Sequence, residues 1–379
     1  MLILLFLSVV FLSYTNGAND NFKGAATLYG SGVLNYRQAI SIVTVATFLG
    51  SIASIFLAQG LIDSFSGKGL VPQEIAETSQ FLMATAAGAG FTVFVAALLG
   101  LPISTTHSLV GGLTGAGFMA VGADVNFSML GSAFLIPLLA SPFIAFALSI
   151  IVYSTFKFIR EGLGLKKEPC ICIGNTRQFV PVRVMAGMDA AETNRAQKMM
   201  QNDGKLTVTL ADTEQCIDLY TGRFWGVPLQ KVLDAIHVLS GAAVSFARGL
   251  NDAPKIAGLL VASAAFDLRW NILAVSTAMA IGGILGAKKV ARTMSLEISD
   301  INHGQGFSAN LVTSFLVIVA SRFGVPVSTT HVSVGSIFGI GAISGQANIR
   351  VIRNILLSWV VVLPAAAAFS ALVYSLTTL

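Results

Sequence analysis

Two short motifs each occur twice in this chain, and the duplication constrains the fold more than any other feature of the sequence. The heptapeptide GANDNFK at Gly17–Lys23 returns as GLNDAPK at Gly249–Lys255, 232 residues later. The octapeptide GLPISTTH at Gly100–His107 returns as GVPVSTTH at Gly324–His331, 224 residues later. A pair of motifs duplicated inside duplicated apolar segments is typical of membrane transporters built from two related halves.

The composition also indicates a membrane protein. Hydrophobic residues make up 54% of the 379 positions, charged residues only 11%, and the mean hydropathy is +0.78. These values exclude a soluble globular protein. The net charge of +5 does not indicate nucleic-acid binding, because 11 of the 23 Lys and Arg residues lie between Lys157 and Lys231 together with eight acidic residues.

Several apolar runs are shorter than the ~20 residues of a membrane-spanning helix, and the short runs border the duplicated motifs. Short runs beside Gly, Pro, Asn and Asp predict discontinuous helices. We therefore predict an all-α polytopic membrane protein of two inverted-topology repeats, with re-entrant hairpins around Pro102 and Pro326. The predicted parts are a first transmembrane repeat at 1–159, a hydrophilic linker at 160–230 and a second transmembrane repeat at 231–379.

Basic residues flank the apolar runs in a pattern that predicts the orientation. The linker and the other basic loops can all lie on one side, so we expect a multi-pass protein of the plasma (cytoplasmic) membrane with a cytoplasmic linker and both termini outside. Residues 1–15 are expected to be a transmembrane segment and not a cleaved leader, because their repeat partner is internal. The three cysteines, Cys170, Cys172 and Cys216, all lie in the linker and are expected to be free thiols.

Asp20 and Asp252 cost the most free energy to place in the membrane, because an acid within a membrane segment needs a partner, a proton or an ion. Each follows an Asn directly and a Gly three residues before, which suits an unwound stretch with free carbonyl groups. Carboxylate, amide and carbonyl oxygens together form a cage that suits a hard cation. The alternative is a pair of ion pairs, to Lys23 and Lys255, at helical i, i+3 spacing, or ordinary helix capping.

The Pro-x-Ser-Thr-Thr tracts have the opposite chemical character. Proline ends one helix, and the hydroxyl groups and free backbone N–H groups at the start of the next helix favour an anion. Two inverted copies bring donors to a tetrahedral oxyanion from two sides; these donors are Ser104, Thr105, Thr106, Ser328, Thr329 and Thr330. Ordinary N-capping is the alternative for a single copy.

His107 and His331 follow the tracts directly, and a Thr beside a His suggests a nucleophile with its base. Adjacent helical residues point about 100° apart, however, so the Thr and the His do not face each other. We expect neutral, packed histidines that donate to a carbonyl. Further polar residues precede each tract: Gln305 and Asn310 before the second, Gln80 and Thr85 before the first. An amide can donate to an anion or offer its carbonyl oxygen to a cation. We add Gln305 to the anion donors, and Asn310 and Thr85 to the cation ligands.

The paired G-x-N-D and P-x-S-T-T-H motifs, in two hydrophobic halves around a hydrophilic loop, resemble the inorganic phosphate transporter (PiT) family. The resemblance covers both hydrophobic halves and implies a secondary active transporter that imports phosphate by cation symport with alternating access. It implies that the acids bind the cation and the Ser-Thr-Thr tracts bind phosphate. It does not extend to the linker.

Sodium is favoured as the coupling ion because the acids keep oxygen-bearing neighbours at Asn19, Asn21 and Asn251, whereas a proton site needs only an acid of raised pKa. We expect Lys23 and Lys255 to lie too far along their helices to neutralise the site, and hence at least two sodium ions per phosphate. Proton coupling, metal-phosphate transport and sulfate transport are the open alternatives.

We expect no catalytic residues and no cofactor; a homodimer is an open alternative for the assembly. The rival functions are an intramembrane hydrolase with a Ser or Thr and a His, which would need one asymmetric centre, and a phosphate sensor that binds without transport.

Overall fold

The computed structural model describes residues 1–162, 227–263, 267–298 and 301–378, and short strands between 167 and 224. Contacts divide the chain into two compact units, one of Met1–Ser154 with Ile236–Leu379 and one of Thr155–Ala235. We call the first the helical unit.

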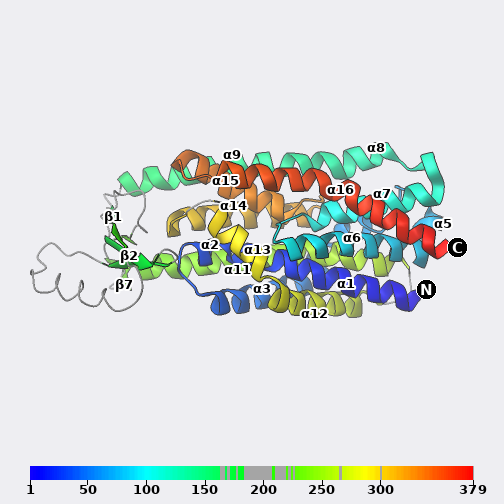
Figure 1. Ribbon diagram of the computed structural model, residues 1–379, viewed down its shortest axis with the longest axis horizontal. Coiled ribbons are helices and arrows are strands. Elements are labelled where there is room, and N and C mark those ends of the chain that lie inside the picture. The colour runs from blue at the N-terminus through cyan, green and yellow to red at the C-terminus, as the bar shows by residue number, and fades with distance from the viewer. Residues whose placement is uncertain are drawn as a thin grey trace, which may run out of the picture. The chain divides into compact units, whose positions relative to one another are not determined.

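Helices make up the described part of the helical unit (Figure 1). The first half contains α1 (Leu2–Asp20), η1 (Asn21–Ala25), α2 (Ala26–Gly30), α3 (Tyr36–Leu57), α4 (Gln59–Ser64), α5 (Gln73–Ala76), α6 (Ser79–Leu99), α7 (Thr105–Val121), η2 (Gly122–Asp124), α8 (Phe127–Met129), η3 (Leu130–Leu135) and α9 (Ile136–Gly162). The second half contains α11 (Leu229–Ala262), α12 (Leu268–Gly286), α13 (Lys288–Arg292), η4 (Thr293–Glu297), α14 (His303–Arg322), α15 (Thr329–Ser344) and α16 (Ile349–Thr378).

Three helices of each half begin at equivalent positions of the duplicated sequence, because the same kinds of residue cap them. Side chains of Asn35 and Asp267 accept backbone N–H groups at the starts of α3 and α12. Thr78 and Asn302 do so for α6 and α14, and Ser104 and Ser328 for α7 and α15. A polar N-cap fixes where a helix begins. The prediction of an all-α fold is confirmed, and the helix starts follow the sequence duplication; the inverted relation of the halves stays a prediction.

The first Asn-Asp motif interrupts its helix, whereas the second does not. α1 ends at Asp20 and the chain continues as the 3-10 turn η1, which brings Gly24 so close to α11 that a Cβ there would lie 2.9 Å from the Gly241 carbonyl oxygen. α11 continues through Asp252 and Pro254, and residues 255–260 after the proline are buried in the core. The expectation of an unwound stretch is therefore wrong for the second copy, where packing on both sides keeps the helix intact.

Each Ser-Thr-Thr tract follows a sharp turn between two contacting helices. α6 packs against α7 and α14 against α15. Gly100 and Gly324 hold the turns with φ of +73° and +68°, a left-handed conformation that favours glycine. The re-entry of these hairpins into the bilayer stays a prediction.

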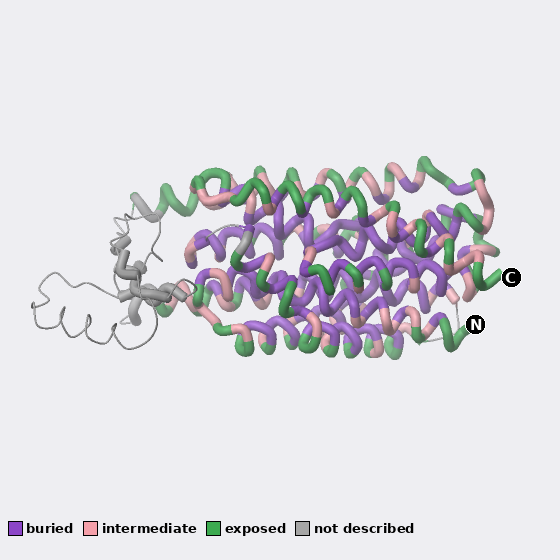
Figure 2. The backbone as a smooth tube through the Cα atoms, viewed as in Figure 1, coloured by how far each residue is buried: buried purple, intermediate pink, exposed green. Residues whose placement is uncertain are grey.

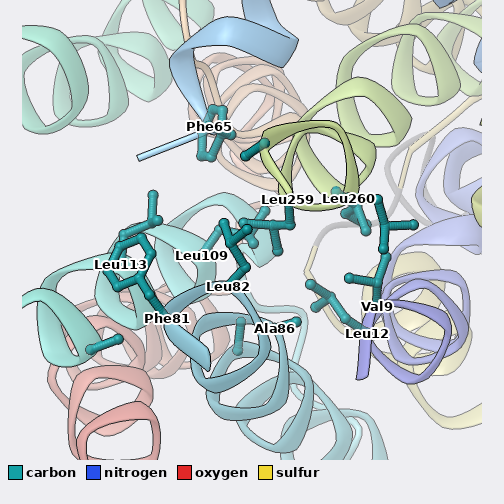
Figure 3. Close-up of a cluster of buried hydrophobic side chains, with 14 of the residues drawn as sticks. Val9, Leu12, Phe65, Phe81, Leu82, Ala86, Leu109, Leu113, Leu259 and Leu260 are labelled. Carbon is teal, nitrogen blue, oxygen red and sulfur yellow. The ribbon is translucent and has the colours of Figure 1, made fainter. Parts of the chain in front are cut away.

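The largest hydrophobic cluster belongs to both halves of the sequence (Figure 3). Val9 and Leu12 of α1 and Leu82 of α6 lie in the same cluster as Leu259 and Leu260 of α11. Because α11 comes from the second half, neither half builds this core alone. Helices α1 and α11, which carry the two Asn-Asp motifs, therefore share one core.

The outer surface of the helical unit is apolar. Phe56, Phe143, Leu285 and Val360 are each 70% exposed or more, while the polar motif residues are buried. Figure 2 shows exposed positions along the outer helices and buried positions in the middle of the bundle. Seven described helical segments are long and apolar enough to cross a bilayer. Such a surface is suited to lipid and not to water. The chain is an integral membrane protein. The start of α1 and the end of α16 lie at the same end of the bundle (Figure 1).

The unit of Thr155–Ala235 contains the described strands, which pair antiparallel. They are β1 (Lys167–Glu168), β2 (Ile171–Asn175), β3 (Gln178–Val182), β4 (Thr207–Thr209), β5 (Leu219–Tyr220), β6 (Arg223–Phe224) and β7 (Val227–Pro228). The predicted free thiols of the three cysteines concern side chains outside the described residues.

Candidate functional site

Five charged side chains are buried in the described part of the helical unit, and all five belong to the duplicated Asn-Asp motifs or the turn before one of them. Each is at most 3% exposed; they are Asp20, Lys23, Arg248, Asp252 and Lys255. Burying a charge without a partner costs several kcal/mol, so the contacts of each group decide what the site can do.

Lys23 links the first Asn-Asp motif to both Ser-Thr-Thr tracts. Its ammonium group donates to the Asp20 carboxylate and to the Thr330 hydroxyl. It also donates to the Ile103 carbonyl oxygen at 2.9 Å, and the Asn19 amide oxygen lies 3.5 Å away. Thr330 donates its own hydroxyl proton to the Ile103 carbonyl at 2.7 Å.

Lys255 makes the equivalent contacts from the second motif. Its ammonium group donates to the Thr106 hydroxyl at 2.9 Å and to the Val327 carbonyl oxygen at 2.6 Å. The Asp252 carboxylate lies 3.9 Å away. Thr106 donates to the Val327 carbonyl at 3.3 Å. The expectation that both lysines lie too far along their helices is wrong, because a four-carbon stem carries each ammonium group to a tract of the other half.

Arg248 is the functional candidate that the sequence reasoning missed. Its Nε lies 3.5 Å from Asp252, and its Nη2 donates to the Asn16 side-chain oxygen at 2.6 Å. Its Nη1 donates to the Asn21 amide oxygen at 3.0 Å. Under the offset of the first motif Arg248 is equivalent to Asn16. A basic residue one turn before Asp252, in the place of an amide, was the available signal.

The first turns of α7 and α15 meet at this charged cluster. Thr105 donates to Asp20 at 3.2 Å, and Thr106 and Thr330 contact the lysines. Ser104 and Ser328 are N-caps whose hydroxyl oxygens accept from His107 N and His331 N. The tracts therefore combine capping with direct contact to the charges, and Thr329 is buried beside them.

The two histidines that follow the tracts pack against each other. Their ring centroids are 4.4 Å apart, and the His331 ring stacks on Trp359 at 3.6 Å. His331 Nδ1 lies 3.3 Å from the Leu138 carbonyl oxygen, as expected for a packed histidine that donates to a carbonyl. His107 Nδ1 instead lies 3.0 Å from the Ser104 hydroxyl.

The asparagines of the motifs hold the backbone of the site. Asn19 donates to the Leu101 carbonyl at 2.8 Å and accepts from Ile103 N at 3.2 Å. Asn251 donates to Asp252 at 3.0 Å and to the Val327 carbonyl at 3.2 Å. Asn21 turns toward α3 and donates to Thr44 at 2.7 Å.

Two of the remaining predicted ligands have other partners, and the buried Thr85 hydroxyl has no hydrogen-bond partner among the described residues. Asn310 donates to Thr27 and Ser240, and Gln305 accepts from the backbone of Asn302 in a capping box. Thr85 is a buried residue of α6. Within the described residues, no hydrogen bond joins these three to either carboxylate.

The site as a whole carries a surplus of positive charge. Three basic side chains and two carboxylates give a formal charge of +1. At least two sodium ions per phosphate were expected for a negative site, whereas the formal charge of this site is positive. An isolated positive charge in a membrane interior is expensive, and an anion of one negative charge removes that cost.

Comparisons with known proteins relate nearly the whole chain to phosphate transporters. The sequence profile described as the phosphate transporter family matches residues 16–370. A Haemophilus influenzae protein provisionally named a phosphate permease is 28% identical over 96% of this chain and 93% of its own length. A Pyrococcus furiosus protein with the same provisional name is 25% identical over 96% and 93%. A solved structure described as "The sodium-dependent phosphate transporter" covers all of this chain and 98% of its own, with a TM-score of 0.75 and 22% identity.

Proposed function

Because the chain belongs to the phosphate transporter family, we propose that it moves inorganic phosphate across the membrane as a secondary transporter and binds it at the buried charged cluster. The observation that carries the proposal is the formal +1 charge where the two Ser-Thr-Thr tracts meet. Singly charged phosphate neutralises that charge. Its oxygens also accept hydrogen bonds from hydroxyl and ammonium groups, and hydrogen bonds to charged partners are the stronger kind.

The donors for phosphate come from both halves. We propose that the anion enters between the first turns of α7 and α15 and takes hydrogen bonds from Thr106, Thr330 and the two lysines. These groups otherwise donate to the Ile103 and Val327 carbonyl oxygens. The helix N-termini add backbone dipoles of the right sign. Ser104, Thr105, Ser328 and Thr329 are proposed to hold the same two turns in place.

Alternating access is proposed on the basis of the same lysine contacts. The lysine contacts between the halves are reciprocal: Lys23 reaches Thr330, and Lys255 reaches Thr106. We propose that the halves rock about this shared site, which opens it to one side at a time. Import, plasma-membrane location, a cytoplasmic linker and outside termini complete the proposal.

The sequence predicts sodium coupling in addition to phosphate transport. This coupling is supported by the solved relative, which is described as sodium-dependent. In this chain a lysine ammonium already lies at each candidate sodium cage. Sodium coupling therefore needs an experiment separate from the test of phosphate transport.

Among the described residues, only the contact between Ser104 and His107 suggests a hydrolase. This contact is also explained without an enzyme. Ser104 accepts the His107 backbone N–H, which is ordinary N-capping. The His107 ring, which would have to act as a base, packs at a tilt against His331, and among the described residues no hydrogen bond joins it to a carboxylate. The chain is a transporter and not an enzyme.

Uptake of labelled phosphate into proteoliposomes tests the proposal, with protein-free liposomes as the control. Intact phosphate accumulating inside, with excess sulfate a poor competitor, is the expected result. Turnover without accumulation would point to a hydrolase, and binding without either would point to a sensor. Sulfate uptake that phosphate does not inhibit would show that sulfate, and not phosphate, is the substrate.

A further inference from the structure

We infer that the ammonium groups of Lys23 and Lys255 take the places of coupling cations, so that this chain binds phosphate without sodium. The inference rests on the proposed function, and it reverses the sequence prediction of sodium symport.

The oxygens around Lys23 are those of a cation cage. They comprise the Asp20 carboxylate, the Thr330 hydroxyl, the Ile103 carbonyl at 2.9 Å and the Asn19 amide oxygen at 3.5 Å. Such oxygens bind hard cations in proteins, and free carbonyl groups near helix ends bind coupling ions in transporters. Lysine places its own charge at the centre of this set.

The second cage repeats three of the four oxygens of the first: the hydroxyl, the backbone carbonyl and the carboxylate. Lys255 contacts the Thr106 hydroxyl at 2.9 Å, the Val327 carbonyl at 2.6 Å and the Asp252 carboxylate at 3.9 Å. These residues are equivalent to Thr330, Ile103 and Asp20 under the sequence duplication. A chance ion pair would not reproduce both a carbonyl of the lysine's own half and a hydroxyl of the opposite half. The arrangement is therefore a feature of the site and not of one helix.

Charge excludes a further cation. The carboxylate of each cage is already neutralised by its lysine, and Arg248 adds a third positive charge through Asp252 and Asn16. A sodium ion entering either cage would meet an ammonium group among the same oxygens, in surroundings that screen charge poorly. An anion is attracted there for the same reason. Phosphate binding is thus balanced by charges that stay attached to the protein.

The experiment is labelled phosphate uptake at fixed pH, with sodium or N-methyl-D-glucamine as the outside cation. The wild-type protein is expected to transport at equal rates in both. Lys23→Ala and Lys255→Ala empty a cage, so uptake is expected to fall about tenfold or more without sodium, the effect of one lost charged donor. Sodium is expected to restore part of it by filling the vacated cage. Lys288→Ala, at an exposed lysine, is the matched control and is expected to behave as wild type.

Wild-type uptake that requires sodium would overturn the inference, and so would lysine variants that transport normally in both cations. If no phosphate is transported under any condition, the proposed function fails separately. Binding of labelled sodium to the purified protein then still decides the inference. Saturable binding to the wild type contradicts it, and binding that appears only in the alanine variants supports it. If those variants do not fold, the wild-type measurements alone decide.

Discussion

Arg248 is the residue whose replacement changes the charge of the site with the least change to the tracts themselves. Arg248→Gln removes the guanidinium group that lies 3.5 Å from Asp252 and 2.6 Å from the Asn16 oxygen. The formal charge of the cluster falls from +1 to zero. Lys255, at 3.9 Å, stays as the partner of Asp252, so no carboxylate is left alone.

The expected effect on phosphate follows from Coulomb's law. A unit charge about 8 Å from the anion, at an effective dielectric constant of about 20, contributes about 2 kcal/mol. That energy corresponds to a rise of about 30-fold in the KM for phosphate. Arg248→Lys keeps the charge but loses the planar fork that holds Asn16 and Asn21, so we expect a smaller rise.

The assay is initial uptake against phosphate concentration in proteoliposomes, with thermal unfolding of the purified protein measured in parallel. Loss of a buried pair also lowers stability, by about 3–5 kcal/mol at most. The matched control is Arg322→Gln, at an exposed arginine of α14. A folded Arg248→Gln protein with an unchanged KM would refute the reasoning, because it would show that the surplus charge does not bind the anion.

Three further predictions concern single changes or labels. Thr330→Val is expected to raise the KM for phosphate about tenfold or more by removing a donor to a charged group, while Thr114→Val, which loses only a hydrogen bond to its own helix, leaves uptake kinetics unchanged. Gly249→Ala is expected to abolish the folded fraction in size-exclusion chromatography, since its Cβ would lie 2.0 Å from the Thr47 carbonyl oxygen, whereas Gly131→Ala, with nothing within 4 Å, is tolerated. A membrane-impermeant thiol reagent is expected to label the linker at 160–230 in inside-out vesicles only; labelling in intact cells would reverse the orientation.

The sequence predicted much of the framework because caps and turns are local. Ser104 and Ser328 begin α7 and α15 where the duplicated motifs place them, and the two glycines adopt the left-handed turns that precede. Such signals depend on neighbouring residues only. The composition likewise predicted the apolar outer surface.

The sequence did not predict which groups meet in space. The reach of Lys23 to Thr330 depends on how the two halves pack, and spacing within one motif says nothing about that contact. The continuity of α11 through Pro254 depends on the burial of residues 247–260 by other helices, which the local sequence does not encode. Arg248 was missed because it belongs to neither repeated motif. The duplication aligns it with Asn16, a residue of different chemistry.

A structure determined by cryo-electron microscopy in sodium phosphate buffer tests the central claim most directly. Tetrahedral density is expected between the first turns of α7 and α15, within hydrogen-bonding distance of Lys23, Lys255, Thr106 and Thr330. Both ammonium groups are expected to remain in their oxygen cages. Phosphate density elsewhere in the protein, or separate ion density in the cages with the lysine side chains displaced, would contradict the account.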